Sequence, residues 1–117
     1  MTDWVLEPKR RKAALKHASE AYWFLTALQH NWRFMGVTRP AARELEPIIA
    51  AALKAITTLT NTTADHSSAA ALLRSVIDGL DSIAQQGSLR EEAQRASARD
   101  EAQRAYQEIT AHRASRL

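Results

Sequence analysis

Six of the seven aromatic residues in this 117-residue chain lie within its first 34 positions, five of them on a predicted helix with two apolar sides. Pro8 suits the first turn of a helix, and helix-favouring residues continue to about residue 35. Trp23 and Trp32 point to opposite sides of that helix, because nine residues at about 100° each make two and a half turns. A helix with two apolar faces cannot bury both on the surface of a small bundle. It must run through the middle of a core or give one face to a partner.

The composition of the whole chain favours an all-helical domain. Alanine occupies 23 positions, whereas glycine and proline occupy three each. Apolar periodicity and the helix start and stop signals predict helices over about 8–35, 39–60, 67–86 and 88–115. A chain of this length suits one domain, so we expect a short N-terminal extension, 1–7, followed by a single helical domain, 8–117.

The second and fourth of these helices have unusual features. Pro47 predicts either a kink in the second helix or a short helix, 39–45, followed by a longer one over about 47–60. The fourth helix contains a near-repeat, 90–96 and 99–105, which places similar residues on opposite sides. Because it has few large apolar residues, we expect it to pack thinly and then project. The predicted fold is all-α: a four-helix bundle-like domain with a kinked second helix and a long, partly projecting C-terminal helix.

Helical spacing also predicts the core side of three helices. On the first helix these positions are Ala14, Leu15, Ala18, Ala21, Tyr22, Leu25, Leu28 and Trp32. On the second they are Leu45, Ile49, Ala52, Ile56 and Leu59. On the third they are Leu72, Leu73, Val76, Ile77, Leu80 and Ile83.

The opposite face of the first helix carries Trp23, Ala27, His30 and Phe34. Two interpretations compete for this face. In the first, the fourth helix covers it inside the bundle. In the second, it is an interface, most simply an isologous dimer in which the helix meets its symmetry mate. Aromatic residues are enriched at interface hot spots, which keeps the second interpretation open.

A basic segment at the start of the first helix suggests a different partner. It consists of Lys9, Arg10, Arg11, Lys12 and Lys16. The net charge is +3, and residues 1–60 hold nine Lys/Arg against five Asp/Glu. Clustered cations bind phosphates, and Trp4 or Trp23 could stack on unpaired bases. A further nucleic-acid interpretation treats the third and fourth helices as a helix-turn-helix, with Arg90, Gln94 and Arg95 opening the reading helix.

The remaining chemistry is sparse. The chain has no cysteine, so thiolate metal sites and disulfides are excluded. The four histidines are scattered, and His17 with Glu20 one turn away is joined by no second ligand pair. No secretory or membrane-spanning segment is apparent. We therefore expect no catalytic residues, metal or cofactor, and a cytoplasmic location without membrane contact. The favoured function is a non-enzymatic helical interaction protein, a homo-oligomer that can bind another protein, and the alternative is a DNA- or RNA-binding factor.

Overall fold

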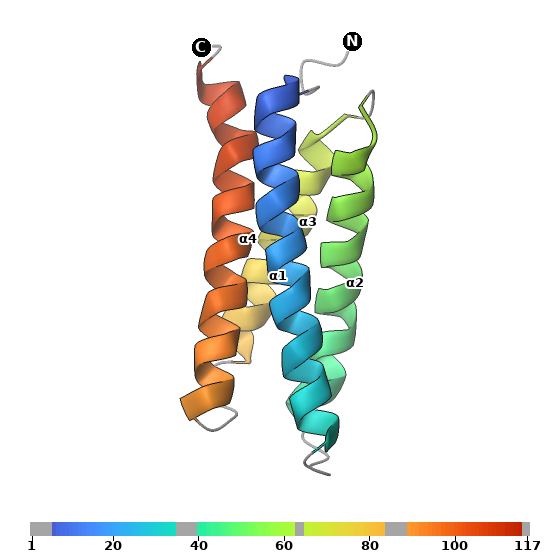
Figure 1. Cartoon of the computed structure of the whole chain (residues 1–117), viewed down its shortest axis with the longest axis vertical. Helices are drawn as coiled ribbons and strands as arrows, with labels where there is room; N and C mark the ends of the chain where they lie inside the picture. The colour runs from blue at the N-terminus through green and yellow to red at the C-terminus, as the bar shows by residue number, and fades with distance from the viewer. Residues whose placement is uncertain (1–5, 35–39, 63–64, 84–88, 116–117) are drawn as a thin grey trace.

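In the computed structural model, the protein is a bundle of four helices (Figure 1). They are α1 (Pro8–Phe34), α2 (Pro40–Thr60), α3 (Ser67–Ser82) and α4 (Leu89–Ser115). The structure describes residues 6–34, 40–62, 65–83 and 89–115, and the side chains of 6–31, 43–62, 65–83 and 92–111. The predicted all-α, four-helix bundle is confirmed. The predicted end of the third helix near residue 86 lies outside the described residues.

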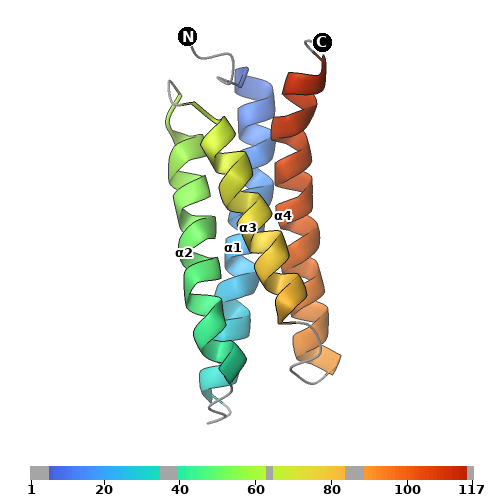
Figure 2. The same cartoon turned by 180° about the vertical axis from the view of Figure 1, so that it is seen from behind.

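Successive helices run in opposite directions, so α1 begins and α4 ends at the same end of the bundle (Figures 1 and 2). Each helix packs on two others: α1 and α3 each contact both α2 and α4. Helices α1 and α3 therefore lie diagonally across the bundle, which measures 48 × 21 × 19 Å. This arrangement leaves one side of α1 facing away from the other helices.

The core follows the predicted stripes on α1 and α3, whereas the stripe on α2 differs. On α2 the fully or nearly buried residues are Leu45, Ile48, Ala52, Ala55 and Leu59. Ile49 and Ile56, which we expected in the core, are only partly buried. Apolar residues occupy both neighbouring stripes of this helix, so spacing alone could not decide between them. The side chain of Trp32 lies outside the described residues.

Helix α4 packs closely along α1, contrary to the expected projection of its later part. Its buried residues are Ala98, Ala102, Ala105 and Ile109, all without exposed surface. They meet a helix whose own buried residues include Ala14, Ala18 and Ala21. Small side chains on both helices allow the two backbones to approach closely, so α4 is buried without large apolar residues. The expectation failed because it counted large side chains only.

Pro47 lies inside a single continuous helix, so the alternative of a short helix over 39–45 followed by a longer one is wrong, while the kink stays a prediction. The proline removes one backbone donor and leaves the carbonyl of Arg43 without its helical partner. Both Pro47 and Arg43 are exposed, so water can satisfy that carbonyl. No described helix has an apolar stretch long enough to cross a bilayer.

The start of α3 is fastened to the beginning of the chain. His66, the residue before the helix, has no exposed surface, and its Nδ1 accepts a hydrogen bond from the Leu6 amide at 2.9 Å. Its Nε2 donates to the carbonyl of Asn61 at 2.8 Å. The adjacent Asp65 carboxylate accepts from the Ser67 amide at 3.0 Å, so one backbone donor at the start of α3 is satisfied.

Candidate interaction surface on α1

Two contacts show which sides of α1 face its neighbours. The Arg11 guanidinium donates to the carbonyl of Leu59 on α2 at 3.0 Å. On the other side, His17 Nδ1 lies 2.6 Å from a carboxylate oxygen of Glu101 on α4. At about 100° per residue, Trp23 is about 120° around the helix from both Arg11 and His17. Trp23 therefore points away from the bundle, between the two neighbouring helices.

The side chain of Trp23 is 64% exposed, the highest value for a large apolar residue among the described side chains. Its only aromatic neighbour in the described residues is Phe24, edge-to-face with ring centroids 5.3 Å apart. Phe24 itself packs on the core. The interpretation in which α4 covers the Trp23 face is therefore wrong, because α4 lies on the side of α1 that carries His17 and Phe24.

The other predicted interface residues are placed in part. His30 is exposed and Ala27 is half-buried, and both lie on the same side of α1 as Trp23. Phe34 is the last residue of α1, and its side chain lies outside the described residues.

The predicted basic segment is divided by the helix into two groups. Lys9, Lys12 and Lys16 are exposed and lie within about 40° of Trp23 around the helix. Arg10 and Arg11 are half-buried and turn away from this stripe: Arg10 lies 3.7 Å from the Glu7 carboxylate, and Arg11 bonds to α2. Only the lysines thus belong to the exposed face of α1.

We call this face the outer stripe of α1. It consists of Lys9, Lys12, Lys16, Ser19, Trp23, Ala27 and His30. It joins the two regions that the sequence presented as separate candidates, the basic segment and the aromatic face. Among the described residues, no carboxylate lies within ion-pair distance of any of the three lysines. The positive charge at the start of the stripe is therefore available to a partner.

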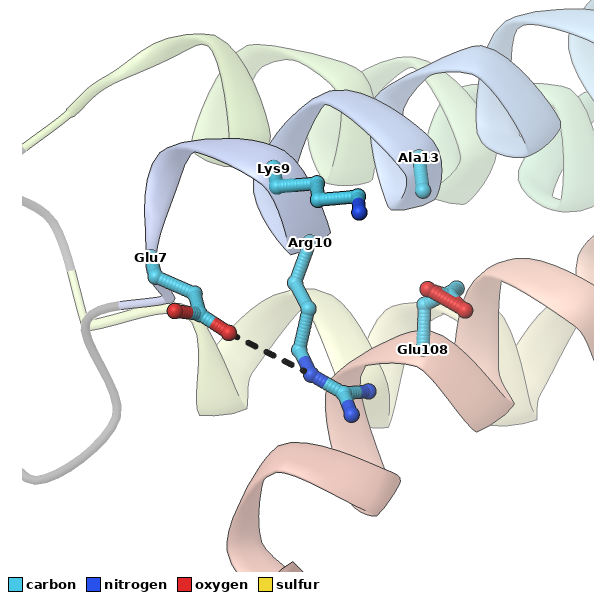
Figure 3. A pocket seen from close by; sticks show the side chains of 5 residues that line it. All are labelled: Glu7, Lys9, Arg10, Ala13 and Glu108. Atoms are coloured by element: carbon cyan, nitrogen blue, oxygen red, sulfur yellow. Dashed lines mark ion pairs between the residues drawn. The ribbon is translucent and has the colours of Figure 1, made fainter.

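A shallow groove of about 450 Å³ lies beside the stripe, between the start of α1 and α4 (Figure 3). Its walls are Glu7, Lys9, Arg10, Ala13 and Glu108. Two carboxylates and two cations line it, with the Arg10 guanidinium lying between Glu7 and Glu108 (Figure 3). Of these charged groups, Arg10 is paired with Glu7, whereas Lys9 has no carboxylate at ion-pair distance among the described residues.

The other polar clusters connect helices to one another. The Glu101 carboxylate is hydrogen-bonded to the His17 imidazole and accepts a second hydrogen bond, at 3.2 Å, from the guanidinium of Arg104. Arg95, half-buried, pairs with Glu92 and also donates to the carbonyl of Leu80 on α3. Each of these side chains is already engaged within the bundle.

The residues predicted to open a helix-turn-helix reading helix are also partly engaged. Gln94 accepts a hydrogen bond from Asn31 of α1 at 2.9 Å. Because Arg95 is also bonded within the bundle, neither side chain faces outward for base contacts. The side chain of Arg90 lies outside the described residues. Within the described residues, no group of three or more metal-ligating side chains occurs.

The structure and sequence together define this protein as an all-α, antiparallel four-helix bundle with an exposed basic and aromatic helix face. Comparison with models of protein families, with curated proteins and with solved structures finds no match to the chain. Sequence reasoning missed the bond between Leu6 and His66. No local pattern indicated it, because the two residues are 60 positions apart.

Proposed function

We propose that this protein is a non-enzymatic, cytoplasmic interaction protein that self-associates through the outer stripe of α1. The observation that carries the proposal is the exposure of Trp23, which is 64% accessible on a face that none of the other helices covers in the described residues. Burying a large apolar side chain yields roughly 1.5–3 kcal/mol, and tryptophan is a frequent hot spot of protein interfaces. A single exposed helix meeting its own copy forms an isologous contact, in which each favourable interaction occurs twice.

The proposal is tested by the molar mass in solution, measured by light scattering over a concentration series. We expect the wild-type chain to reach twice its monomer mass, and Trp23→Ser to remain monomeric with unchanged helicity. Leu53→Ser is the matched control, because among the described side chains Leu53 on α2 is the other large apolar one with high exposure, at 48%. A monomeric wild type at the highest concentration, or equal loss in both variants, contradicts the proposal.

A second candidate function is phosphate binding by the lysines of the outer stripe. The observation that favours it is their spacing: Lys9, Lys12 and Lys16 are exposed on one face and have no described carboxylate at ion-pair distance. Three cations along one helix face can contact successive phosphates of DNA or RNA. Such binding releases counterions and weakens steeply as salt rises.

Mobility-shift titrations with duplex DNA and single-stranded RNA test this candidate. We expect a shift at low salt that is lost in Lys9→Gln/Lys12→Gln/Lys16→Gln. Lys54→Gln is the matched control, since Lys54 is an exposed lysine on α2, away from the stripe. Binding that is independent of salt, or equally reduced by the control, contradicts the role of the stripe.

A further inference from the structure

The outer stripe of α1 changes character along its length. Its first half carries the exposed cations Lys9, Lys12 and Lys16, and its middle carries Trp23 between two small residues, Ser19 and Ala27. This gradient has consequences for how two copies can meet. If two α1 helices packed in the same direction, each lysine would face its own copy across the contact. Like charges at such short range repel one another, so this orientation is disfavoured.

We propose that in a dimer the α1 helices of the two copies pack against each other and run in opposite directions. The two-fold axis that relates the copies passes at the height of residue 25. This proposal rests on the proposed function, self-association through the outer stripe. The occupant of the stripe is thus a second copy of this chain. In this register, residues whose numbers sum to 50 face each other. Trp23 of one copy lies over Ala27 of the second copy, and the reverse contact is made by symmetry.

Side-chain size supports the opposite orientation of the two helices. Ser19 and Ala27 are each one turn from Trp23 on the same face, so the indole projects above small neighbours on both sides. An indole packs well over a residue with a small side chain, because the small side chain leaves space on the helix surface that the ring can fill. In the same-direction arrangement the two indoles would instead meet each other, and the small residues would meet small residues.

Charge supports the opposite orientation as well. The lysine end of one copy then lies toward the end of the second copy where α1 ends and α2 begins. That end carries two exposed carboxylates, Glu44 and Glu46, beside one exposed cation, Arg43. Meanwhile the two Lys16 residues are about 27 Å apart along the helices, from 18 residues at about 1.5 Å each, well beyond the range of screened repulsion.

Single-cysteine cross-linking tests this orientation, because the chain has no cysteine of its own. Ser19→Cys and His30→Cys lie on the same side of the stripe, and their numbers sum to 49. We mix the two variants, one with a mass tag, and oxidise gently. The expected product is the mixed disulfide between the two variants. Each variant alone should cross-link poorly, because its two copies would be about 15–18 Å apart along the helices, beyond the 4.4–6.8 Å that a disulfide spans.

Ser75→Cys, an exposed position on α3, is the control that should not cross-link with either variant. Disulfides within each variant alone, with none between them, overturn the orientation and indicate helices running in the same direction. A dimer by light scattering with no disulfide of any kind also overturns it, since the stripe then lies outside the contact. A wild-type chain that stays monomeric refutes the proposed function itself, so the two failures are distinguishable.

A charge exchange gives an independent test. Lys12→Glu/Lys16→Glu and Glu44→Lys/Glu46→Lys should each weaken the dimer, and a chain that carries all four changes should recover it. Recovery is expected only when unlike ends meet. If the four-fold variant dimerises no better than the two double variants, the proposed orientation is wrong.

Discussion

The imidazole of His66 and the backbone of Leu6 form a buried hydrogen bond of 2.9 Å that joins the start of the chain to the turn before α3. Because Nδ1 accepts from an amide, it carries no proton, and Nε2 must be the nitrogen that donates to Asn61. Leu6 is itself 3% exposed, so this residue belongs to the core although it precedes the first helix. The His66 side chain thus links the residues before α1 to the turn between α2 and α3, at the end of the bundle where α1 begins.

The first prediction concerns this histidine. His66→Leu replaces the imidazole with an apolar side chain of similar size. It removes both the acceptor for the Leu6 amide and the donor to the Asn61 carbonyl. We expect a loss of about 1–3 kcal/mol in the free energy of unfolding, because the buried Leu6 amide loses its partner. Urea unfolding followed by circular dichroism measures it, and the Leu6 amide should exchange its hydrogen faster. Ser75→Ala, at an exposed position, serves as the control, and equal stability of the two variants contradicts the assignment.

The second prediction concerns Gly79 in α3. A Cβ atom there would lie 2.7 Å from Cγ1 and 2.8 Å from Cδ1 of Ile48 on α2, closer than non-bonded carbons approach. We expect Gly79→Ala to destabilise the protein by about 1–2 kcal/mol, since the steric cost exceeds the gain of about 1 kcal/mol in helix propensity.

In the Ile48→Ala background the obstructing atoms are gone, so Gly79→Ala should become neutral or stabilising. A double-mutant cycle from urea unfolding measures this coupling. Additive effects of the two substitutions would falsify the steric explanation.

The third prediction concerns the alanine packing of α4. Ala102 has no exposed surface, so Ala102→Leu should force α4 away from the helices on which it packs and lower the unfolding free energy by about 1–3 kcal/mol. Ala96→Leu, at an exposed position of the same helix, is the matched control and should change stability by less than about 0.5 kcal/mol. Thermal and urea unfolding measure both, and comparable effects at the two positions argue against close packing of these helices.

The fourth prediction concerns the pH dependence of the contact between α3 and α4. Hydrogen bonds from the Arg99 guanidinium, at 2.6 Å from the nearer oxygen, hold the pKa of Asp81 below its ordinary value, although partial desolvation opposes this. A lowered folded-state pKa adds stability above the unfolded carboxyl pKa of about 3.9, and that stability is lost as pH falls through the folded value.

Because Asp81 is about half exposed, with a side chain 49% accessible, solvent screening keeps this contribution to a few tenths of a kcal/mol. Asp81→Asn should therefore cost this amount at pH 7, and less at pH 2.5 or in high salt. Urea unfolding at the two pH values measures the difference. A cost that persists unchanged in acid shows that the charge is not its source.

Sequence pattern was sufficient for the four helices and for most of the core on α1 and α3. The spacing of Leu73, Val76 and Leu80 leaves only one apolar side to α3, and all three are buried. On α2 the pattern was ambiguous because apolar residues occupy two neighbouring stripes, and Ile48 rather than Ile49 is the buried residue. Which stripe is buried depends on where α1 and α3 lie around α2.

The candidate site was predictable in its residues but not in its shape. Trp23 and the lysines were singled out by residue type, but Arg10 and Arg11 were grouped with them because they are adjacent in the chain. Their helical positions turn them toward other partners, and the backbone carbonyl that receives Arg11 belongs to a residue 48 positions away. The groove lined by Glu7 and Glu108 combines the two ends of the chain and has no local signal.

The local sequence determined that this chain forms four helices. The high alanine content, the period of the apolar residues and the positions of proline and glycine set this, because helix propensity acts within a few residues. The tertiary structure alone decided which helices became neighbours. That choice made the alanines of α4 a close contact with α1 and turned a buried histidine into an anchor for Leu6. It also left Trp23 facing water. Each of these outcomes depends on contacts between residues far apart in the chain, which no local pattern encodes.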